Sequence, residues 1–239
     1  MIDRANANTT AIEDVPLPRH DYRTYLDGPL DERLARLVTR LSQEHRPGRG
    51  VPQLLVAPDD QVLRAVCSVL RVAYDDARVT TTFYVWPAHA IVVTPGLTAM
   101  LNHPDVRSRL CGLRFLLHEW WHALRTDRQR VYGLEEGGAE LFADRMLETL
   151  TGVDGSLRRI QVYRGLVTGV LRLGERRRGT GAALAWAWES RTTPDVKAWL
   201  TGELTALGVN HPDIAPIIGY SETTGGSWAQ LVEQALPGR

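Results

Sequence analysis

Two histidines stand four residues apart near the middle of the sequence, in the stretch FLLHEWWHALR. On an α-helix, residues four apart lie on one face about one turn from each other, so the imidazoles of His118 and His122 can bind one metal ion. Glu119 follows the first histidine directly. It is too close in sequence to share the coordination sphere, but it is well placed to hold and deprotonate a metal-bound water. The spacing H-E-x-x-H therefore predicts a zinc hydrolase site.

A catalytic zinc ion usually has three protein ligands and a water, so the site needs a further ligand. The segment LEEGGAELFADR offers Glu136, Glu140 and Asp144 at intervals of four residues, which a helix would present on one face. A short loop between the two segments lets the second helix fold back on the first. We expect Gly137 and Gly138 to let these two backbones approach closely, because each glycine otherwise costs a helix on the order of 1 kcal/mol.

This combination resembles the gluzincin metallopeptidases, in which H-E-x-x-H on one helix is followed by a glutamate on the next. ELFADR resembles the E-x-x-A-D-R segment of the prenyl-protein endopeptidase family and of its small soluble relatives, the minigluzincins. The resemblance implies one Zn²⁺ per chain, bound by His118, His122 and Glu140. It also implies that Asp144 orients a ligating histidine without touching the metal.

A second alignment with the gluzincins assigns the third zinc ligand to another glutamate. EEGGAELFA also resembles the E-G-x-A segment of the aminopeptidase branch, which implies that Glu136 binds zinc and that Glu140 supports it from outside. Two features favour Glu140. Its distance along the chain from His122 is nearer to the spacing usual in compact gluzincins, and IVVTPGLTAML resembles the strand and turn before the site helix of the prenyl-protein endopeptidases.

The resemblance extends over roughly residues 90–147. The sequence departs from the family in the bulky Trp120 and Trp121 and in the absence of transmembrane segments. We expect Trp121 to wall the site and to narrow the range of substrates.

The reaction that follows from this resemblance is hydrolysis of a peptide bond, with Glu119 as the catalytic base. Candidate donors for the oxyanion are His211, Tyr220 and Tyr163, and the hairpin from Phe83 to Val93 is the candidate strand for binding an extended peptide. Two alternatives stay open: a metal-binding regulatory or interaction module, and a hydrolase of a non-peptide amide. Glu119 argues against a pure scaffold, which needs no general base.

The flanking sequence predicts the elements that position the site. Leu30, Leu34, Leu37, Val38 and Leu41 share one helical face, and VPQLLVAP reads as a strand. DDQVLRAVCSVLRVAY predicts a helix, and two β-rich runs around Pro87–His89 predict a hairpin. A long helix is expected over about 104–126, a second over about 134–150, and further helices after that.

These elements indicate an α+β fold, with a small zincin-like sheet, an H-E-x-x-H active-site helix and a mostly helical C-terminal part. Residues 1–28 read as a flexible arm and 29–239 as a single domain, whose helical part begins at about residue 127. Thr193 is expected to cap a helix that begins at Pro194, and Ser227 with Gln230 has the spacing of a capping box.

Composition excludes several classes of function. The 239 residues carry a formal net charge of zero, which is atypical of proteins that bind nucleic acid or an anionic membrane. No apolar run reaches the roughly 18 residues of a membrane span, and the N-terminus has no secretory signal. Cys67 and Cys111 read as reduced core residues. We expect a cytoplasmic enzyme with a peptide or protein substrate, in an oligomeric state that the sequence leaves open.

Overall fold

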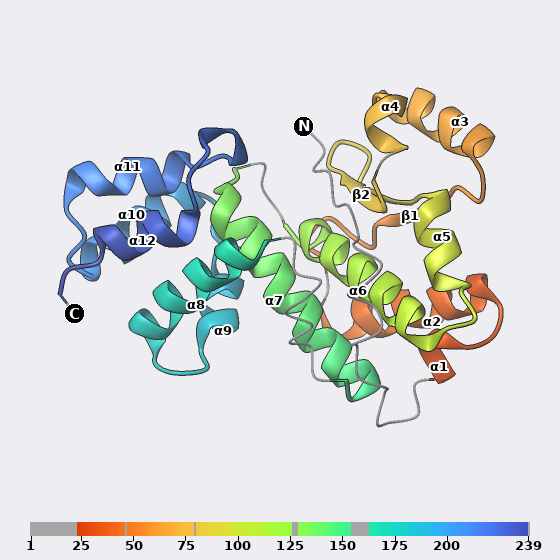
Figure 1. Cartoon of the computed structure of the whole chain (residues 1–239), viewed down its shortest axis with the longest axis horizontal. Coiled ribbons are helices and arrows are strands. Elements are labelled where there is room, and N and C mark those ends of the chain that lie inside the picture. Colours follow the sequence, from red (N-terminus) through yellow and green to blue (C-terminus); the bar gives the residue numbers. More distant parts are fainter. Residues whose placement is uncertain (1–22, 46, 79, 126–128, 154–162, 239) are drawn as a thin grey trace. The chain divides into compact units, whose positions relative to one another are not determined.

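The computed structural model describes residues 23–45, 47–78, 80–125, 129–153 and 163–238. These residues form twelve α-helices, one 3-10 helix and a mixed sheet of three strands, which confirms the predicted α+β class (Figure 1). Contacts divide the chain into two compact units, residues 1–124 with 143–162, and residues 125–142 with 163–239. That residues 29–239 form one domain stays a prediction.

The first unit contains the sheet and the helices around it. Residues 1–22 of the predicted arm lie outside the described residues, whereas Leu26 is buried. The elements are α1 (Arg23–Leu26), α2 (Leu30–Glu44), β1 (Gln53–Val56), α3 (Asp60–Leu70), α4 (Tyr74–Ala77), β2 (Thr82–Val85), β3 (Ala90–Val93), α5 (Pro95–Leu101), α6 (Val106–Ala123) and the second part of α7 (Tyr132–Thr151).

The sheet has the strand order β1-β3-β2, so β2 is an edge strand. β1 pairs with β3 in parallel, with Gln53 opposite Ala90, and β2 pairs with β3 in antiparallel fashion, with Thr82 opposite Val93. The predicted strand VPQLLVAP and the predicted hairpin are both confirmed. The hairpin brings an antiparallel strand to the edge of the sheet.

Side chains at the hairpin turn fix its conformation. His89 has a positive φ of 47°, which is uncommon for a residue with a side chain. Its Nδ1 atom is 2.8 Å from the Tyr84 hydroxyl, and its Nε2 atom is 2.6 Å from the carbonyl oxygen of Gly50. Arg49 donates to the carbonyl of Trp86 at 2.7 Å. The loop before β1 therefore holds the turn of the β2–β3 hairpin in place.

The two faces of the sheet are covered by different helices. Val85 and Val92 pack with α3 and α4 around Leu63 and Cys67. Since successive side chains in a strand point to opposite faces, Ile91 and Val93 face the other way, and both are fully buried. Helix α6 contacts β2 and β3 there and also packs along α5 (Figure 1). The site helix is thus supported by the sheet.

The second unit is helical, as predicted for the C-terminal part. Besides the first part of α7, it consists of α8 (Arg164–Arg178), α9 (Ala183–Glu189), α10 (Val196–Ala206), α11 (His211–Gly219), a 3-10 helix (Glu222–Thr224) and α12 (Trp228–Ala235).

The indole of Trp228 on α12 packs against α7 and α8. Added Cβ atoms would approach it to 2.3 Å at Gly133 of α7 and to 2.4 Å at Gly169 of α8, distances that real Cβ atoms do not show. The indole nitrogen donates to the carbonyl of Ile217 at 3.1 Å, so its polar atom is satisfied within the core. Only glycine at these two positions leaves room for the ring.

Gly137 is a second position where two helices approach closely, and the partner helix is α8. A Cβ atom at Gly137 would lie 2.7 Å from the carbonyl oxygen of Leu166 at the start of α8. The prediction that Gly137 serves the approach of the two site helices is therefore wrong in its partner, because the backbone of α8 occupies this side of α7. For Gly138 it stays a prediction.

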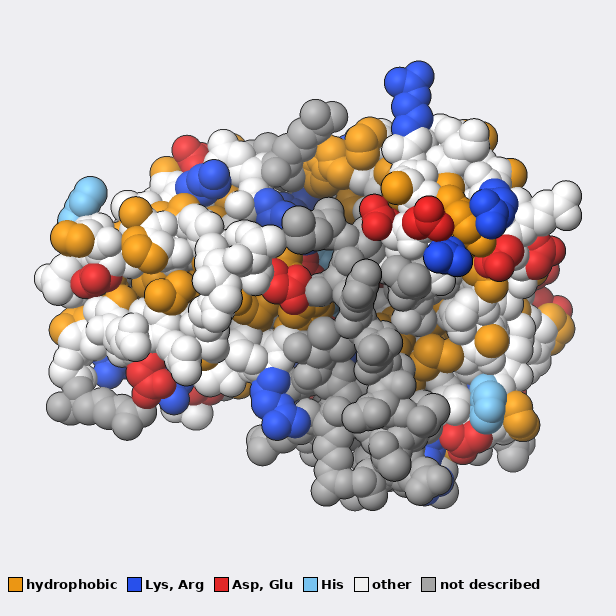
Figure 2. Space-filling model, turned by 45° about the horizontal axis from the view of Figure 1, so that its top comes forward, with side chains coloured by type: hydrophobic (Ala, Val, Ile, Leu, Met, Phe, Trp, Pro, Cys, Tyr) orange, Lys and Arg blue, Asp and Glu red, His pale blue; other side chains and the backbone are white. Residues whose placement is uncertain are grey.

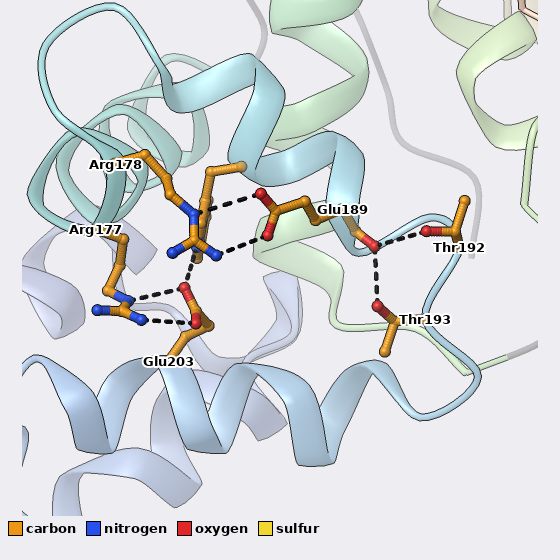
Figure 3. A network of polar contacts seen from close by, with 7 residues as sticks. Arg177, Arg178, Glu189, Thr192, Thr193 and Glu203 are labelled. Atoms are coloured by element: carbon orange, nitrogen blue, oxygen red, sulfur yellow. Dashed lines mark hydrogen bonds and ion pairs between the residues drawn. The ribbon is translucent and has the colours of Figure 1, made fainter.

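Three helices of the second unit are joined by charged side chains (Figure 3). Glu203 of α10 accepts from Arg177 of α8 at 2.8 and 3.0 Å and from the indole nitrogen of Trp186 of α9 at 2.7 Å. The bond from Arg177 holds the pKa of Glu203 below its ordinary value, although partial burial opposes it. Beside it, Arg178 and Glu189 form an ion pair at 2.9 Å.

Two predicted helix caps differ in the structure. Helix α10 begins at Val196, and Asp195 caps it by accepting from the backbone nitrogen of Ala198 at 3.0 Å. Thr193 is not the cap, because its hydroxyl donates to the carbonyl of Glu189 at 2.9 Å, and a carboxylate two residues later caps equally well (Figure 3).

The predicted capping box at the start of α12 is also wrong. Ser227 does occupy the N-cap position, but its side chain makes no capping hydrogen bond. Its hydroxyl oxygen would lie 2.9 Å from a Cβ atom on Gly165, so this side chain is packed towards α8 instead.

The surface charges are of mixed sign, and the two cysteines are not bridged, as the composition indicates. On the face drawn in Figure 2, acidic and basic side chains are interspersed, in a chain of zero formal net charge. Both cysteines are buried and unbridged, as predicted, and burial raises the pKa of Cys111 to about 11. None of the described helices combines the length and the apolar character needed to cross a membrane.

Candidate metal centre

Helix α6 carries the H-E-x-x-H residues in its last turns. Asp105 caps its first turn by accepting from the backbone nitrogen of Ser108 at 3.1 Å, and the helix ends at Ala123. The C-terminal end of a helix carries a partial negative charge, which favours a nearby cation. His122 lies in this last turn, so the backbone itself favours a metal ion at this position.

The two histidines converge, as their spacing predicts. The Nε2 atoms of His118 and His122 are 3.2 Å apart, and the ring planes cross at 69°. Zinc–nitrogen bonds of about 2.0–2.1 Å in a tetrahedral site would hold two such atoms about 3.3 Å apart. The observed separation is close to this value, and the same distance allows a hydrogen bond from one ring nitrogen to the other.

Glu119 lies beside this pair. One ligand atom from each of His118, Glu119 and His122 is within 4.8 Å of each of the others. His118 is buried, whereas Glu119 and His122 are partly exposed. A carboxylate that is close to a metal position and open to solvent can take a proton from a bound water, which is the function that the sequence predicts for it.

The surroundings of α6 are more enclosed than the sequence suggests. One face of the helix is an apolar stripe whose residues are all buried: Leu113, Leu116, Leu117, Trp120 and Leu124. Trp121 is also fully buried. However, the polar side of the helix is not simply a solvent-facing surface, since His118 is only 7% exposed and Arg114 only 1%.

Arg114 is the polar neighbour that the sequence analysis missed. It lies one helical turn before His118, and its Nε atom donates to Oδ1 of Asp144 on α7 at 2.7 Å. Both residues belong to the first unit. Asp144 was predicted to orient a ligating histidine, which stays a prediction. The available signal was a single charged residue inside the apolar run LRFLL.

Glu135, Glu136 and Glu140 of α7 belong to the second unit and are buried. Glu136 forms an ion pair with Arg130, and Glu135 forms ion pairs with Arg125 and, at 3.4 Å, with Arg191. The sequence analysis identified none of these arginines, because they are separated from α7 by loops or by most of the helical part. Which of Glu136 and Glu140 is the third ligand stays a prediction.

Two of the three candidate oxyanion donors lie in one aromatic cluster of the second unit. Tyr163 and Tyr220 have ring centroids 6.4 and 6.3 Å from that of Tyr132, the first residue of α7. The Tyr132 hydroxyl donates to Glu222 at 3.3 Å. The third candidate, His211, begins α11 and is exposed. That one of Tyr163, Tyr220 and His211 donates to the oxyanion stays a prediction.

Comparison with known proteins provides no independent assignment. No protein-family model matches the chain, and no curated protein or solved structure is significantly similar to it. The candidate centre therefore rests on its own geometry.

Proposed function

We propose that the chain is a gluzincin-type zinc metallopeptidase with a zincin-like arrangement of edge strand and site helix. The observation that carries this proposal is the pair of imidazole nitrogens, 3.2 Å apart on one face of α6, with the Glu119 carboxylate beside them. Packing alone has no need for two converging imidazole nitrogens next to a partly exposed carboxylate. A metal ion with an activated water needs all three groups.

The proposed ligands are His118, His122 and Glu140, with Glu136 as the alternative. A set of two imidazoles and one carboxylate suits zinc and leaves a fourth position for water. The choice of Glu140 rests on its distance along the chain from His122, which is nearer to the spacing usual in compact gluzincins.

In this proposal the protein residues carry out proton transfer and orientation. Bound zinc would polarise the scissile carbonyl and lower the pKa of its water to about 7. Glu119 takes the proton from that water and passes it to the leaving amine. Tyr163, Tyr220 and His211 are the candidate donors to the oxygen that becomes negatively charged.

The peptide substrate would bind in extended form along β2. This strand is at the edge of the sheet, so one side of its backbone is available for pairing, and α6 packs against it. Phe83 and Tyr84 on β2 are partly exposed. The hairpin contacts made by His89 would keep this edge rigid, which reduces the entropy lost when a peptide binds.

The test is to separate metal binding from catalysis. Protein purified without added metal should contain about one zinc ion per chain by elemental analysis. Glu119→Gln keeps the shape of the side chain and removes the base, so it should retain the metal while cleavage of a peptide library falls at least about a hundredfold. Glu148→Gln, on the exposed side of α7, is the matched control and should cleave as the wild type does.

Each outcome has a distinct meaning. If the purified protein binds no transition metal, the proposal as a whole is contradicted. Bound metal without cleavage of peptides would favour the regulatory module or the hydrolase of a non-peptide amide. Equal cleavage by Glu119→Gln and the wild type would leave the metal in a structural role.

A further inference from the structure

We propose that Arg114, through its ion pair with Asp144, is a positioning residue that fixes α6 against the second part of α7 and thereby aligns the two imidazole ligands, His118 and His122. This inference rests on the proposed function, because it concerns the same metal centre. It begins from a contact inside the first unit, where Arg114 Nε and Asp144 Oδ1 are 2.7 Å apart.

The pair is too deeply buried to be an ordinary surface contact. The side chain of Arg114 is 1% exposed and that of Asp144 is 13% exposed. Burying two charges costs several kcal/mol of desolvation, and well-packed apolar residues of similar volume are often as stable or more stable. Buried pairs of this kind are best attested where they specify one arrangement of two helices among several. We therefore assign the pair to the alignment of α6 and α7.

The helical repeat connects this alignment to the metal ligands. On α6, His118 and His122 follow Arg114 by one and two intervals of four residues. On the second part of α7, Asp144 accepts from Arg114, so this ion pair lies one helical turn from His118 within the first unit. A change at the pair would therefore displace the part of α6 that carries the two histidines.

Arg114 suits this function better than a lysine would. Its planar guanidinium offers donors in a fixed geometry and stays charged when buried, whereas a lysine ammonium rotates freely and loses its charge more readily on burial. The carboxylate of Asp144 is thus held in a defined direction as well as at a defined distance.

The test compares metal affinity with stability in matched variants. Zinc affinity is measured by competition with a chromophoric chelator, and the melting temperature of the metal-free protein is measured in parallel. Arg114→Met should weaken zinc binding about 10–100-fold, the range found for residues that orient ligands without touching the metal. Arg114→Lys keeps the charge and should recover part of this loss.

The control is a second buried arginine of the same unit. Arg33 is 3% exposed and donates to the carbonyl of Leu101 at 2.8 Å and to Asn102 at 2.7 Å. Arg33→Met should lower the melting temperature and leave the zinc affinity of the folded protein unchanged. A loss of affinity in this variant equal to that of Arg114→Met would overturn the inference, because any buried arginine would then have the same effect.

A double variant keeps the test decisive if Arg114→Met does not fold. Arg114→Met combined with Asp144→Leu removes both charges and should regain the melting temperature. We expect its zinc affinity to stay at least about tenfold below that of the wild type. If the folded double variant binds zinc as tightly as the wild type, the positioning function is refuted while the proposed metallopeptidase stands. If the wild type itself binds no zinc, both fail.

Discussion

Two of the buried charged clusters among the described residues differ in what their atoms require. In the second unit, Glu203 accepts three hydrogen bonds from Arg177 and Trp186, and the cluster joins α8, α9 and α10 (Figure 3). In the first unit, the pair of Arg114 and Asp144 lies one turn from His118 and two turns from His122, and the Nε2 atoms of these histidines are 3.2 Å apart.

The two clusters differ in how their hydrogen-bond donors and acceptors are matched. Around Glu203, each oxygen meets a donor, so the cluster is complete without any further ligand. His118 and His122 instead bring two ring nitrogens together, which can bind one cation or, as one N–H donor and one acceptor, hydrogen-bond to each other. Burial and charge are common to both clusters. The convergence of like ligand atoms distinguishes the candidate metal centre from a cluster that serves packing.

The largest effect should come from removing one of the converging groups. His118→Ala and His122→Ala should each weaken zinc binding by more than about a hundredfold, the upper end for residues that only support a ligand. Glu203→Gln should leave the zinc content unchanged. The measurement is elemental analysis after dialysis against a weak chelator. Unchanged zinc in both histidine variants would remove the difference between the two clusters.

The next effect separates the two candidate glutamates. Glu140→Ala should lose zinc to a competing chelator more readily than Glu136→Ala, which should be weakened about 10–100-fold at most. Asp144→Asn should be intermediate, since it loosens the alignment without removing a ligand. If Glu136→Ala is the weakest binder of the three, the aminopeptidase-like register is the correct one.

The Glu203 cluster should affect stability and its dependence on pH instead. Glu203→Gln leaves Arg177 and Trp186 without an anionic acceptor and should lower the free energy of unfolding by about 2 kcal/mol near neutral pH. Because folding lowers the pKa of Glu203, its contribution is present above the ordinary value of 4.5 and is lost as the pH falls through the lower folded value. Urea unfolding across this range should show the two proteins converging. A constant difference would contradict the assignment.

The smallest effect should come from an exposed ion pair on the same helix as Asp144. Arg145 and Glu148 are 2.9 Å apart, with side chains 64% and 48% exposed. Arg145→Ala should change the free energy of unfolding by less than about 0.5 kcal/mol and should not change zinc affinity. A loss of zinc comparable to that of Asp144→Asn would mean that neighbouring charges on α7 act on the site without regard to burial.

Much of the framework around the site could be predicted because its signals are local. The hairpin follows from β-branched and aromatic runs on either side of Pro87–His89, and the site helix follows from its apolar stripe and the spacing of its histidines. Helix α5 carries equally local signals that the sequence analysis passed over. Thr94 caps it, with the backbone nitrogen of Leu97 as the donor, and Pro95 is its first residue.

The buried arginines could not be predicted in the same way. A single arginine in a helix is usually exposed, and its burial depends on which distant residue accepts its hydrogen bonds. Arg33 donates to the carbonyl of Leu101 at the end of α5, and Arg114 donates to the carboxylate of Asp144 on α7. Equally, intervals of four residues make Glu136 and Glu140 equivalent on one helical face. What distinguishes them is tertiary, such as the partner of Glu136, Arg130.

The packing of Trp228 against two glycines has a consequence for how the second unit folds. The ring fills a space bounded by Gly133 and Gly169, so the start of α7 reaches its packed state only once a residue far along the chain has arrived. Contacts between distant parts of a chain form late, because the intervening loop must be closed first. The segment that carries Glu136 and Glu140 therefore completes its core among the last steps of folding.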